Sequence, residues 1–307
     1  MNIIDRNFSE LVKEIKELNE KELYYRIRSS FDKIPYETKK SCMDFFNKFD
    51  FWGHLDLEKG NYEEIELKQI ALFNHIDDFA WLYGKLCDYR SKRTLYAILN
   101  NWYRYDFSST TRSREYMFDD YFDLDLVKCG KEEVIVDIGA YVGDTVLSYI
   151  KNYGEEYKKI YCYEITPETF QLLQQNLKQY KNIECRLKGI ADKADKMSIT
   201  KNAESSSANT LEKDNRGEVV VTTLDEDIAE PVTMIKIDIE GFEQKAIKGA
   251  EKHILNDHPK LLISVYHNNE DLWKIPKMIY EISKDYKFYL RFNSSPIYPT
   301  EITLIGI

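Results

Sequence analysis

The residues best suited to chemistry lie where short apolar runs of the sequence end. Asp137 and Gly139 follow the β-branched run 134–136, and Gly143 begins a segment with helical spacing of its apolar residues. A strand that turns through glycines into a helix presents backbone N–H groups to a ligand. The spacing here is Gly-x-x-x-Gly rather than Gly-x-Gly-x-x-Gly, so the loop alone fits a cofactor site and a plain turn equally well.

A carboxylate, Glu164, closes the next apolar run, residues 159–165. Thr166 and Pro167 after it predict the N-cap and the first position of a helix. Glu164 follows the glycine loop by about twenty residues, the place where a carboxylate accepts both hydroxyls of a ribose. The apolar flanks favour this role over that of a surface glutamate.

Later runs also end in polar or small residues, and ligands of open α/β sheets bind outside the C-terminal ends of strands. These ends carry Gly189, Ala191 and Asp192, then Asp238 and Glu240, and finally Tyr266 and His267. His267 is the best candidate for a general base, because an unperturbed histidine has a pKa of about 6.5. The alternatives are a surface loop for His267, and for Asp238 or Glu240 the cap of a helix beginning at Phe242. Glu243 is expected in the first turn of that helix.

The pattern after residue 133 alternates between strands and helices. We expect strands at 133–138, 159–165, 183–189, 218–223, 233–239, 260–266, 287–292 and 301–306, and helices at 144–153, 167–179, 242–255 and 271–283. This alternation predicts a doubly wound, mostly parallel sheet. The last two strands have no helix between them, so they should pair antiparallel.

Four stretches together resemble the FkbM-type S-adenosylmethionine-dependent methyltransferases. They are Asp137-Ile-Gly-Ala-Tyr-Val-Gly-Asp-Thr145, the strand end at Glu164, Thr223-Leu-Asp225, and residues 235–243 (Ile-Lys-Ile-Asp-Ile-Glu-Gly-Phe-Glu) with Ile247-Lys-Gly249. The resemblance covers roughly residues 115 to 307. Two positions depart from it: Tyr141 stands where many such enzymes have the middle glycine, and Ser264-Val-Tyr-His267 replaces a Glu-x-His strand end.

The resemblance implies a Rossmann-like class I fold with a seven-stranded sheet whose last strand is reversed. It also implies S-adenosyl-L-methionine as cofactor and O-methylation, often of a sugar hydroxyl on a glycan or a glycosylated small molecule. The cofactor residues would be Asp137, Gly139, Ala140, Tyr141, Gly143, Asp144, Thr145, Glu164, Ala191, Asp192 and Asp238. The catalytic candidates are His267, Asp238 and Glu240, and either carboxylate could instead bind the methionine ammonium or orient the acceptor.

Residues 1–114 are expected to form a helical cap domain, and residues 115–307 the methyltransferase domain. Apolar residues at 8, 11, 12, 15 and 18 follow the spacing of an amphipathic helix, as do those around 65–73 and 95–102. The polar segment 106–114 has the composition of a linker. Aromatic residues are dense in the cap, where they fill the core, cover the acceptor or make a homodimer contact.

Composition excludes several classes of function. The net charge of −10 argues against nucleic acid and anionic membranes as partners. No apolar run approaches the roughly 18 residues of a membrane span, and no secretory signal is visible. The five widely spaced cysteines indicate reduced, mostly buried thiols in a cytoplasmic protein, and abundant Lys, Ile, Asn and Tyr hint at a bacterial AT-rich genome.

We expect no metal site, since metal-binding motifs with histidine are missing and the run Asp119, Asp120, Asp123 and Asp125 is typical of a solvated face. Two alternatives to a methyltransferase remain. The glycine loop and Glu164 also fit a nicotinamide-dependent oxidoreductase, although that enzyme needs close backbone access where Tyr141 stands. The other alternative is a catalytically silent cofactor-binding module, against which Asp238, Glu240 and His267 argue.

Overall fold

The computed structural model describes residues 2–49, 51–117, 121–200, 209–212 and 217–307. The chain divides into two compact units. The first comprises residues 1–116, 265–277 and 287–304, and the second comprises residues 117–264, 278–286 and 305–307. Two C-terminal segments that the sequence pattern assigned to the methyltransferase domain therefore belong to the first unit. The division at residue 114 as a domain boundary stays a prediction.

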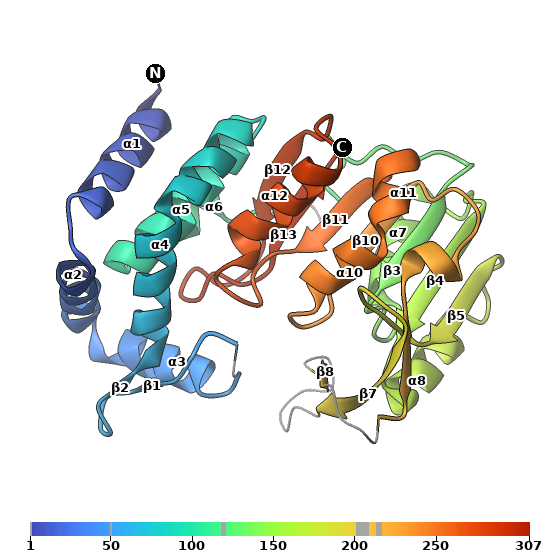
Figure 1. Ribbon diagram of the computed structural model, residues 1–307, viewed down its shortest axis with the longest axis horizontal. Coiled ribbons are helices and arrows are strands. Elements are labelled where there is room, and N and C mark those ends of the chain that lie inside the picture. Colours follow the sequence, from blue (N-terminus) through green and yellow to red (C-terminus); the bar gives the residue numbers. More distant parts are fainter. Residues whose placement is uncertain (1, 50, 118–120, 201–208, 213–216) are drawn as a thin grey trace. The chain divides into compact units, whose positions relative to one another are not determined.

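The N-terminal part of the first unit is helical, as the apolar spacing predicts. Figure 1 shows its helices in blue to teal: α1 (Ile3–Lys16), α2 (Glu20–Lys33), α3 (Tyr36–Phe46), α4 (Glu63–Lys85), α5 (Tyr89–Arg104) and α6 (Phe107–Ser113). Asn2 and Asn19 form capping boxes at α1 and α2, in which each side chain accepts the backbone N–H three residues on. A two-residue ribbon of β1 (Leu55–Asp56) and β2 (Asn61–Tyr62) precedes α4.

The expected linker at 106–114 is wrong, because most of it forms helix α6. Asp106 is the N-cap, and its carboxylate accepts the N–H of Ser108 at 2.9 Å. Buried Thr110 donates from its hydroxyl to the carbonyl of Pro296 at 2.9 Å, which fixes the helix to the C-terminal part of the same unit. The polar residues of this segment therefore cap and anchor a helix, and do not form a solvated linker.

The main sheet has seven strands in the order β12-β13-β11-β10-β3-β4-β5. Their bounds are β3 (Val134–Ile138), β4 (Lys159–Glu164), β5 (Ile183–Leu187), β10 (Met234–Ile237), β11 (Lys260–Ser264), β12 (Phe288–Phe292) and β13 (Ile302–Gly306). The pairs β3–β4, β4–β5, β10–β3 and β10–β11 are parallel. Every residue of the central strand β3 is buried, as the β-branched run predicts. The predicted mostly parallel α/β sheet is confirmed.

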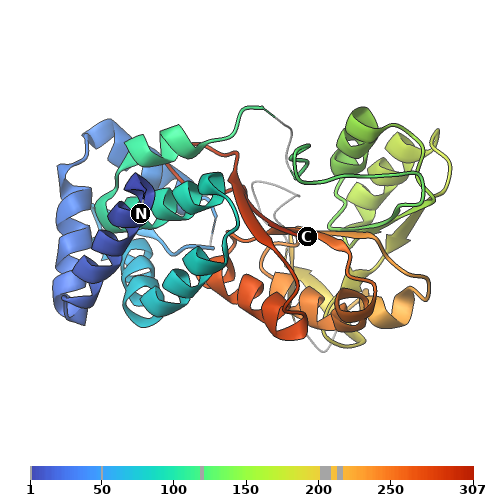
Figure 2. The ribbon, with the colours of Figure 1, turned by 90° about the horizontal axis from the view of Figure 1, so that it is seen from above.

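Helices cover both faces of the sheet in the second unit. In Figure 2, α7 (Asp144–Tyr153) and α8 (Pro167–Leu177) lie on one face, and α10 (Glu243–Gly249) and α11 (Glu251–Asn256) lie on the other. The single helix expected at 242–255 is wrong, since it breaks at Ala250. A Cβ on Gly249 would come within 2.0 Å of the Ala191 carbonyl oxygen, so glycine is required where the helix passes this backbone. The remaining helices are α9 (Leu224–Asp227) and α12 (Asp271–Ile282).

A second sheet was not predicted, although the strand expected at 218–223 is one of its members. It consists of β6 (Gly189–Ile190), β7 (Asp195–Thr200), β8 (Thr210–Glu212) and β9 (Val219–Thr222), in the order β6-β9-β7-β8. The expected strand at 183–189 is wrong in its last residues, because β5 ends at Leu187 and Gly189 already pairs with β9. Burial of Ala191, Met197, Leu211 and Val221 in one apolar cluster stabilises this small sheet.

Among the described residues, no helix is long and apolar enough to cross a membrane. The five cysteines are free thiols; Cys42 and Cys162 are buried, Cys87 is exposed and the others are half-buried, so the expectation of mostly buried thiols is only partly met.

Candidate cofactor pocket and catalytic residues

A pocket of about 560 Å³ lies in the second unit at the C-terminal ends of β3, β4 and β10. Six of its lining residues were candidates from the sequence: Gly139, Tyr141, Glu164, Gly189, Asp238 and Glu240. Their convergence follows from the parallel register, which brings the ends of neighbouring strands to one edge of the sheet.

Three residues of the glycine loop have left-handed backbones: Gly139 (φ 80°), Tyr141 (φ 46°) and Gly143 (φ 89°). The N–H groups of Gly139 and Ala140 donate to the Tyr163 carbonyl at 3.0 and 2.9 Å, which ties the loop to the end of β4. Tyr141 adopts a left-handed backbone conformation that is usually found at glycine. Although tyrosine replaces the glycine found in many such enzymes, the backbone still makes the turn.

Gly139 is required by the end of β10. A Cβ at Gly139 would lie 1.9 Å from the carbonyl oxygen of Asp238. Glycine is therefore needed at this position whether or not a ligand is bound, because protein backbone already occupies the space that a side chain would need.

A buried ion pair lies beneath the loop. Lys236 Nζ is 3.0 Å from Asp137 Oδ1 and donates to the Gly139 carbonyl at 2.7 Å. Burial raises the pKa of Asp137 to about 6, although the neighbouring charge of Lys236 lowers it. Burial also lowers the pKa of Lys236, but the charges of Asp137 and Asp238 outweigh this effect and raise it. Asp137 therefore holds the loop through Lys236 rather than lining the pocket.

Glu164 lines the pocket and anchors the start of α8. Its Oε1 accepts the N–H groups of Ile165 at 2.8 Å and Thr166 at 2.7 Å. Thr166 is the N-cap residue, as expected, but its own side chain makes no capping hydrogen bond. Burial raises the pKa of Glu164, while the hydrogen bonds from Thr166 and Ile165 lower it. These contacts fix the orientation of the carboxylate toward any ligand in the pocket.

Asp238 is held by a residue that the sequence did not single out. The Tyr121 hydroxyl donates to Asp238 Oδ2 at 2.6 Å and lies 3.1 Å from the Ser264 hydroxyl. Glu240 follows with a left-handed φ of 56°. The N-cap of the next helix is Phe242, which makes no side-chain capping hydrogen bond, and Glu243 Oε1 accepts the Ile239 N–H at 2.9 Å. Neither Asp238 nor Glu240 is the N-cap of α10, so the alternative that one of them caps this helix is wrong.

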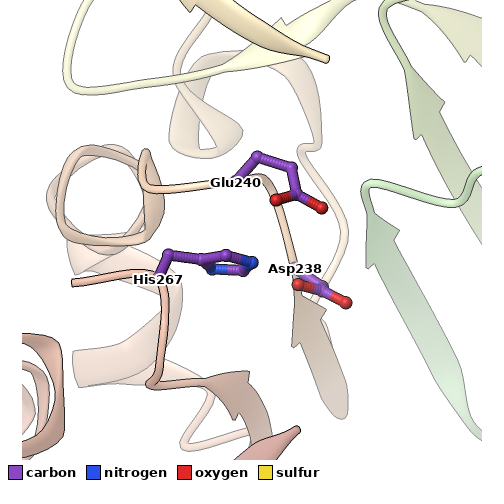
Figure 3. Close-up of side chains that lie close together, drawn as sticks. All are labelled: Asp238, Glu240 and His267. Atoms are coloured by element: carbon purple, nitrogen blue, oxygen red, sulfur yellow. The ribbon is translucent and has the colours of Figure 1, made fainter. Parts of the chain in front are cut away.

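His267 belongs to the first unit and follows the end of β11 by three residues. It is buried, with its ring centroid 4.2 Å from that of Tyr266 and 5.4 Å from that of Phe51. The alternative of a surface loop histidine is therefore wrong. Figure 3 shows its side chain together with those of Asp238 and Glu240, which follow β10. All three are residue types that ligate metal ions, so the expected absence of a metal stays a prediction.

The other predicted cofactor residues do not line the pocket. Seven residues are in this group: Asp137, Ala140, Gly143, Asp144, Thr145, Ala191 and Asp192. Of these, Asp192 is exposed. Residues that line it without having been predicted include Tyr163, Thr166, Lys188, Asn209 and Phe242. The lysine in the apolar run 234–237 was a usable signal for Lys236, since a charge inside a buried strand needs a partner. In the acidic run, Asp119 and Asp120 lie outside the described residues. Asp123 is buried and accepts the Asp125 N–H at 3.0 Å, so the expected solvated face is wrong for this residue.

The strand order, with β3 between β10 and β4 and the pocket at the C-terminal ends of these strands, defines a Rossmann-like class I methyltransferase fold. Residues 137–290 match the Methyltransferase FkbM domain, so the chain belongs to the FkbM methyltransferase family. The resemblance noted in the sequence is confirmed. No curated protein matches the chain.

The chain is similar to the crystal structure of an FkbM methyltransferase from Methylobacillus flagellatus, with 25% identity and a TM-score of 0.65. That match covers 81% of this chain and 63% of the other, so this chain spans less than two thirds of its relative. An rRNA methylase from Streptococcus thermophilus matches with 18% identity and a TM-score of 0.37. That match covers 57% of this chain and 86% of the other. Fibrillarin from Aeropyrum pernix, with bound S-adenosyl-L-methionine, matches with 13% identity and a TM-score of 0.37. That match covers 59% of this chain and 70% of the other.

Proposed function

We propose that this protein is an S-adenosylmethionine-dependent O-methyltransferase that acts on a sugar hydroxyl of a glycan or a glycosylated small molecule. The observation that carries the proposal is the pocket at the ends of β3, β4 and β10 in a chain of the FkbM family. Methyl transfer from a sulfonium demands mainly that cofactor and acceptor be held in line in a dry site.

The pocket offers groups for each part of the cofactor. The buried carboxylate of Glu164 is fixed by two backbone N–H groups, which suits it to accept the ribose hydroxyls. Asp238 and Glu240 can bind the methionine ammonium through charge-assisted hydrogen bonds. Lys188 and Asn209 add donors to the wall. Among the residues named from the sequence, Gly139, Tyr141 and Gly189 also line the pocket.

The general base is proposed to be His267, with Asp238 and Glu240 as the rival candidates. An alcohol must lose its proton as the methyl group is transferred, and a histidine accepts a proton near neutral pH. Support comes from the order of the strands, because His267 follows β11, and β11 pairs with β10 in register up to Ile237 and Ile263.

With this activity we propose a cytoplasmic location in a bacterial cell and a small-molecule or glycan acceptor. We also propose a homodimer contact through the N-terminal helices. The net charge of −10 supports an acceptor other than nucleic acid or a membrane surface. The free thiols of all five cysteines agree with a reducing compartment.

The test is transfer of a labelled methyl group from S-adenosylmethionine to a panel of glycans, glycosylated small molecules, RNA and protein. Label in a sugar ether is the expected result, and label only in RNA or protein would contradict the proposal. His267→Asn should lower turnover by about 10²–10⁴ and remove the acidic limb of the pH profile, with little change in cofactor affinity. Loss of turnover only in Asp238→Asn or Glu240→Gln would instead make a carboxylate the base.

A thermal-shift experiment and the methyl-transfer assay together separate the two alternatives. A nicotinamide-dependent oxidoreductase would be stabilised by NADH and not by S-adenosylhomocysteine in a thermal-shift experiment. A silent module would bind S-adenosylhomocysteine and transfer no label to any acceptor class.

A further inference from the structure

Two thiols lie side by side on neighbouring strands of the second unit. Cys162 of β4 and Cys185 of β5 are direct partners in the parallel register, as are Glu164 and Leu187 two residues further on. Side chains of paired residues point to the same face of a sheet. The two thiols therefore lie on the face that carries Glu164, which lines the cofactor pocket.

The spacing of the two strands suits a disulfide. Neighbouring strands lie about 4.8 Å apart, and disulfides join residues whose Cα atoms are about 4.4–6.8 Å apart. Both cysteines are free thiols, and their side chains hydrogen-bond to each other. Because β5 is the edge strand of the main sheet and Cys185 is half-buried, a small oxidant can reach the pair from this side.

The two thiols differ in acidity. For the buried Cys162, the hydrogen bond with Cys185, burial and the charge of its other register partner, Asp137, raise the pKa well above the ordinary value. For Cys185, the hydrogen bond with Cys162 lowers the pKa, although burial and the charge of Asp137 oppose this effect. Since the thiolate is the nucleophile, Cys185 is the sulfur that reacts first.

We propose that Cys162 and Cys185 form a dithiol that hydrogen peroxide oxidises to a disulfide, and that this bond weakens cofactor binding through Glu164. The Cys185 thiolate attacks a peroxide oxygen and breaks the O–O bond, which gives a sulfenic acid and a hydroxide that takes up the proton released by Cys185. The Cys162 sulfur then attacks the Cys185 sulfur, and the hydroxide that leaves takes the Cys162 proton. Two thiols are oxidised, and one peroxide is reduced to two water molecules.

The disulfide acts on the pocket through β4. The Cβ atoms of a disulfide are about 3.8 Å apart, so bridging two strands with a spacing of about 4.8 Å draws them together by about 1 Å. Glu164 ends β4 two residues after Cys162, so the shift reaches its carboxylate and misaligns its hydrogen bonds to a ligand. This effect on binding rests on the proposed function, whereas the oxidation itself does not.

The test treats the reduced full chain with hydrogen peroxide and then blocks the remaining thiols by alkylation. Trypsin, which cleaves after lysine and arginine, places Cys162 in residues 160–178 and Cys185 in residues 182–186. A disulfide joins the two peptides, and mass spectrometry detects the joined species. The variants are Cys185→Ser, Cys162→Ala and the matched control Cys87→Ser, which removes an exposed thiol of the first unit. Urea unfolding under reducing conditions shows that each variant is folded.

The joined peptides should form in the wild type and in Cys87→Ser, and in neither of the other variants. Calorimetric affinity of the wild type for S-adenosylhomocysteine should fall about threefold to tenfold on oxidation, the range of one displaced hydrogen bond, and should recover with dithiothreitol. The affinity of Cys185→Ser should not respond to peroxide.

The proposal is overturned if the two peptides stay separate, if Cys185 goes to a sulfinic acid without a bridge, or if the bridged and reduced proteins bind equally. A loss of affinity in Cys185→Ser as large as in the wild type would also overturn it. A reduced protein that does not bind S-adenosylhomocysteine would instead refute the proposed cofactor pocket, and the joined peptides would still establish the dithiol chemistry.

Discussion

Replacement of Lys236 by methionine should make stability depend on pH in a specific way. Lys236 is 4% exposed, and its Nζ lies 3.0 Å from Oδ1 of the buried Asp137. With Lys236 present, burial already raises the pKa of Asp137 from 3.8 to about 6. Without Lys236, the pKa of Asp137 must rise further, because the positive charge that opposes the desolvation of the carboxylate is gone.

The sign follows from proton binding. Above pH 6 the wild type releases the Asp137 proton in both states, whereas folded Lys236→Met keeps the proton that the unfolded chain releases. The stability of the variant relative to the wild type should therefore fall by about 1.4 kcal/mol per pH unit above pH 6. The expected additional loss is about 1.4 kcal/mol at pH 7 and about 3 kcal/mol at pH 8.

The assay is urea unfolding of both proteins at pH 6, 7 and 8. The double variant Lys236→Met/Asp137→Asn is the matched control, because its buried side chain cannot titrate and its slope should vanish. A stability difference between Lys236→Met and the wild type that is independent of pH would refute the account, as would a double variant that keeps the slope.

Two further predictions concern the contacts of Asp238. Gly139→Ala should cost about 1–3 kcal/mol more than Gly154→Ala in thermal unfolding, since both glycines have positive φ but only Gly139 faces backbone at 1.9 Å; equal losses would mean that backbone strain alone decides. Tyr121→Phe removes the 2.6 Å hydrogen bond to Asp238, so we expect a loss of about 1–3 kcal/mol in urea unfolding, and an unchanged midpoint would show that this bond contributes nothing.

Local pattern was enough to predict the sheet. The strands β3, β4 and β10 are short apolar runs, and each is followed by a turn signal and a helix, so their parallel pairing could be inferred without any knowledge of distant contacts. Pro167 after Thr166 marked the start of α8. The glycine loop and Glu164 fall in one pocket because parallel strands end at the same edge.

Contacts between distant residues could not be predicted in this way. The requirement for Gly139 comes from the Asp238 carbonyl, and the support of Asp238 comes from Tyr121, a residue in a segment without regular pattern. Gly189 pairs with β9 in the second sheet and not with the main sheet. That sheet is stabilised by burial of Met197 and Leu211, whose strands show only weak alternation of apolar and polar residues. Segment 106–114 shows the same limit, because capping and anchoring residues have the composition of a linker.

Calorimetric titration with S-adenosylhomocysteine tests the central claim, that the pocket at the ends of β3, β4 and β10 is a cofactor site. We predict one site per chain, with affinity weakened by about 1–3 kcal/mol in Glu164→Ala, the cost of leaving polar groups unpaired. Glu168→Ala is the matched control, because this glutamate lies four residues further on and does not line that pocket. The absence of heat at millimolar ligand, or an affinity that is the same in wild type, Glu164→Ala and Glu168→Ala, would contradict the claim.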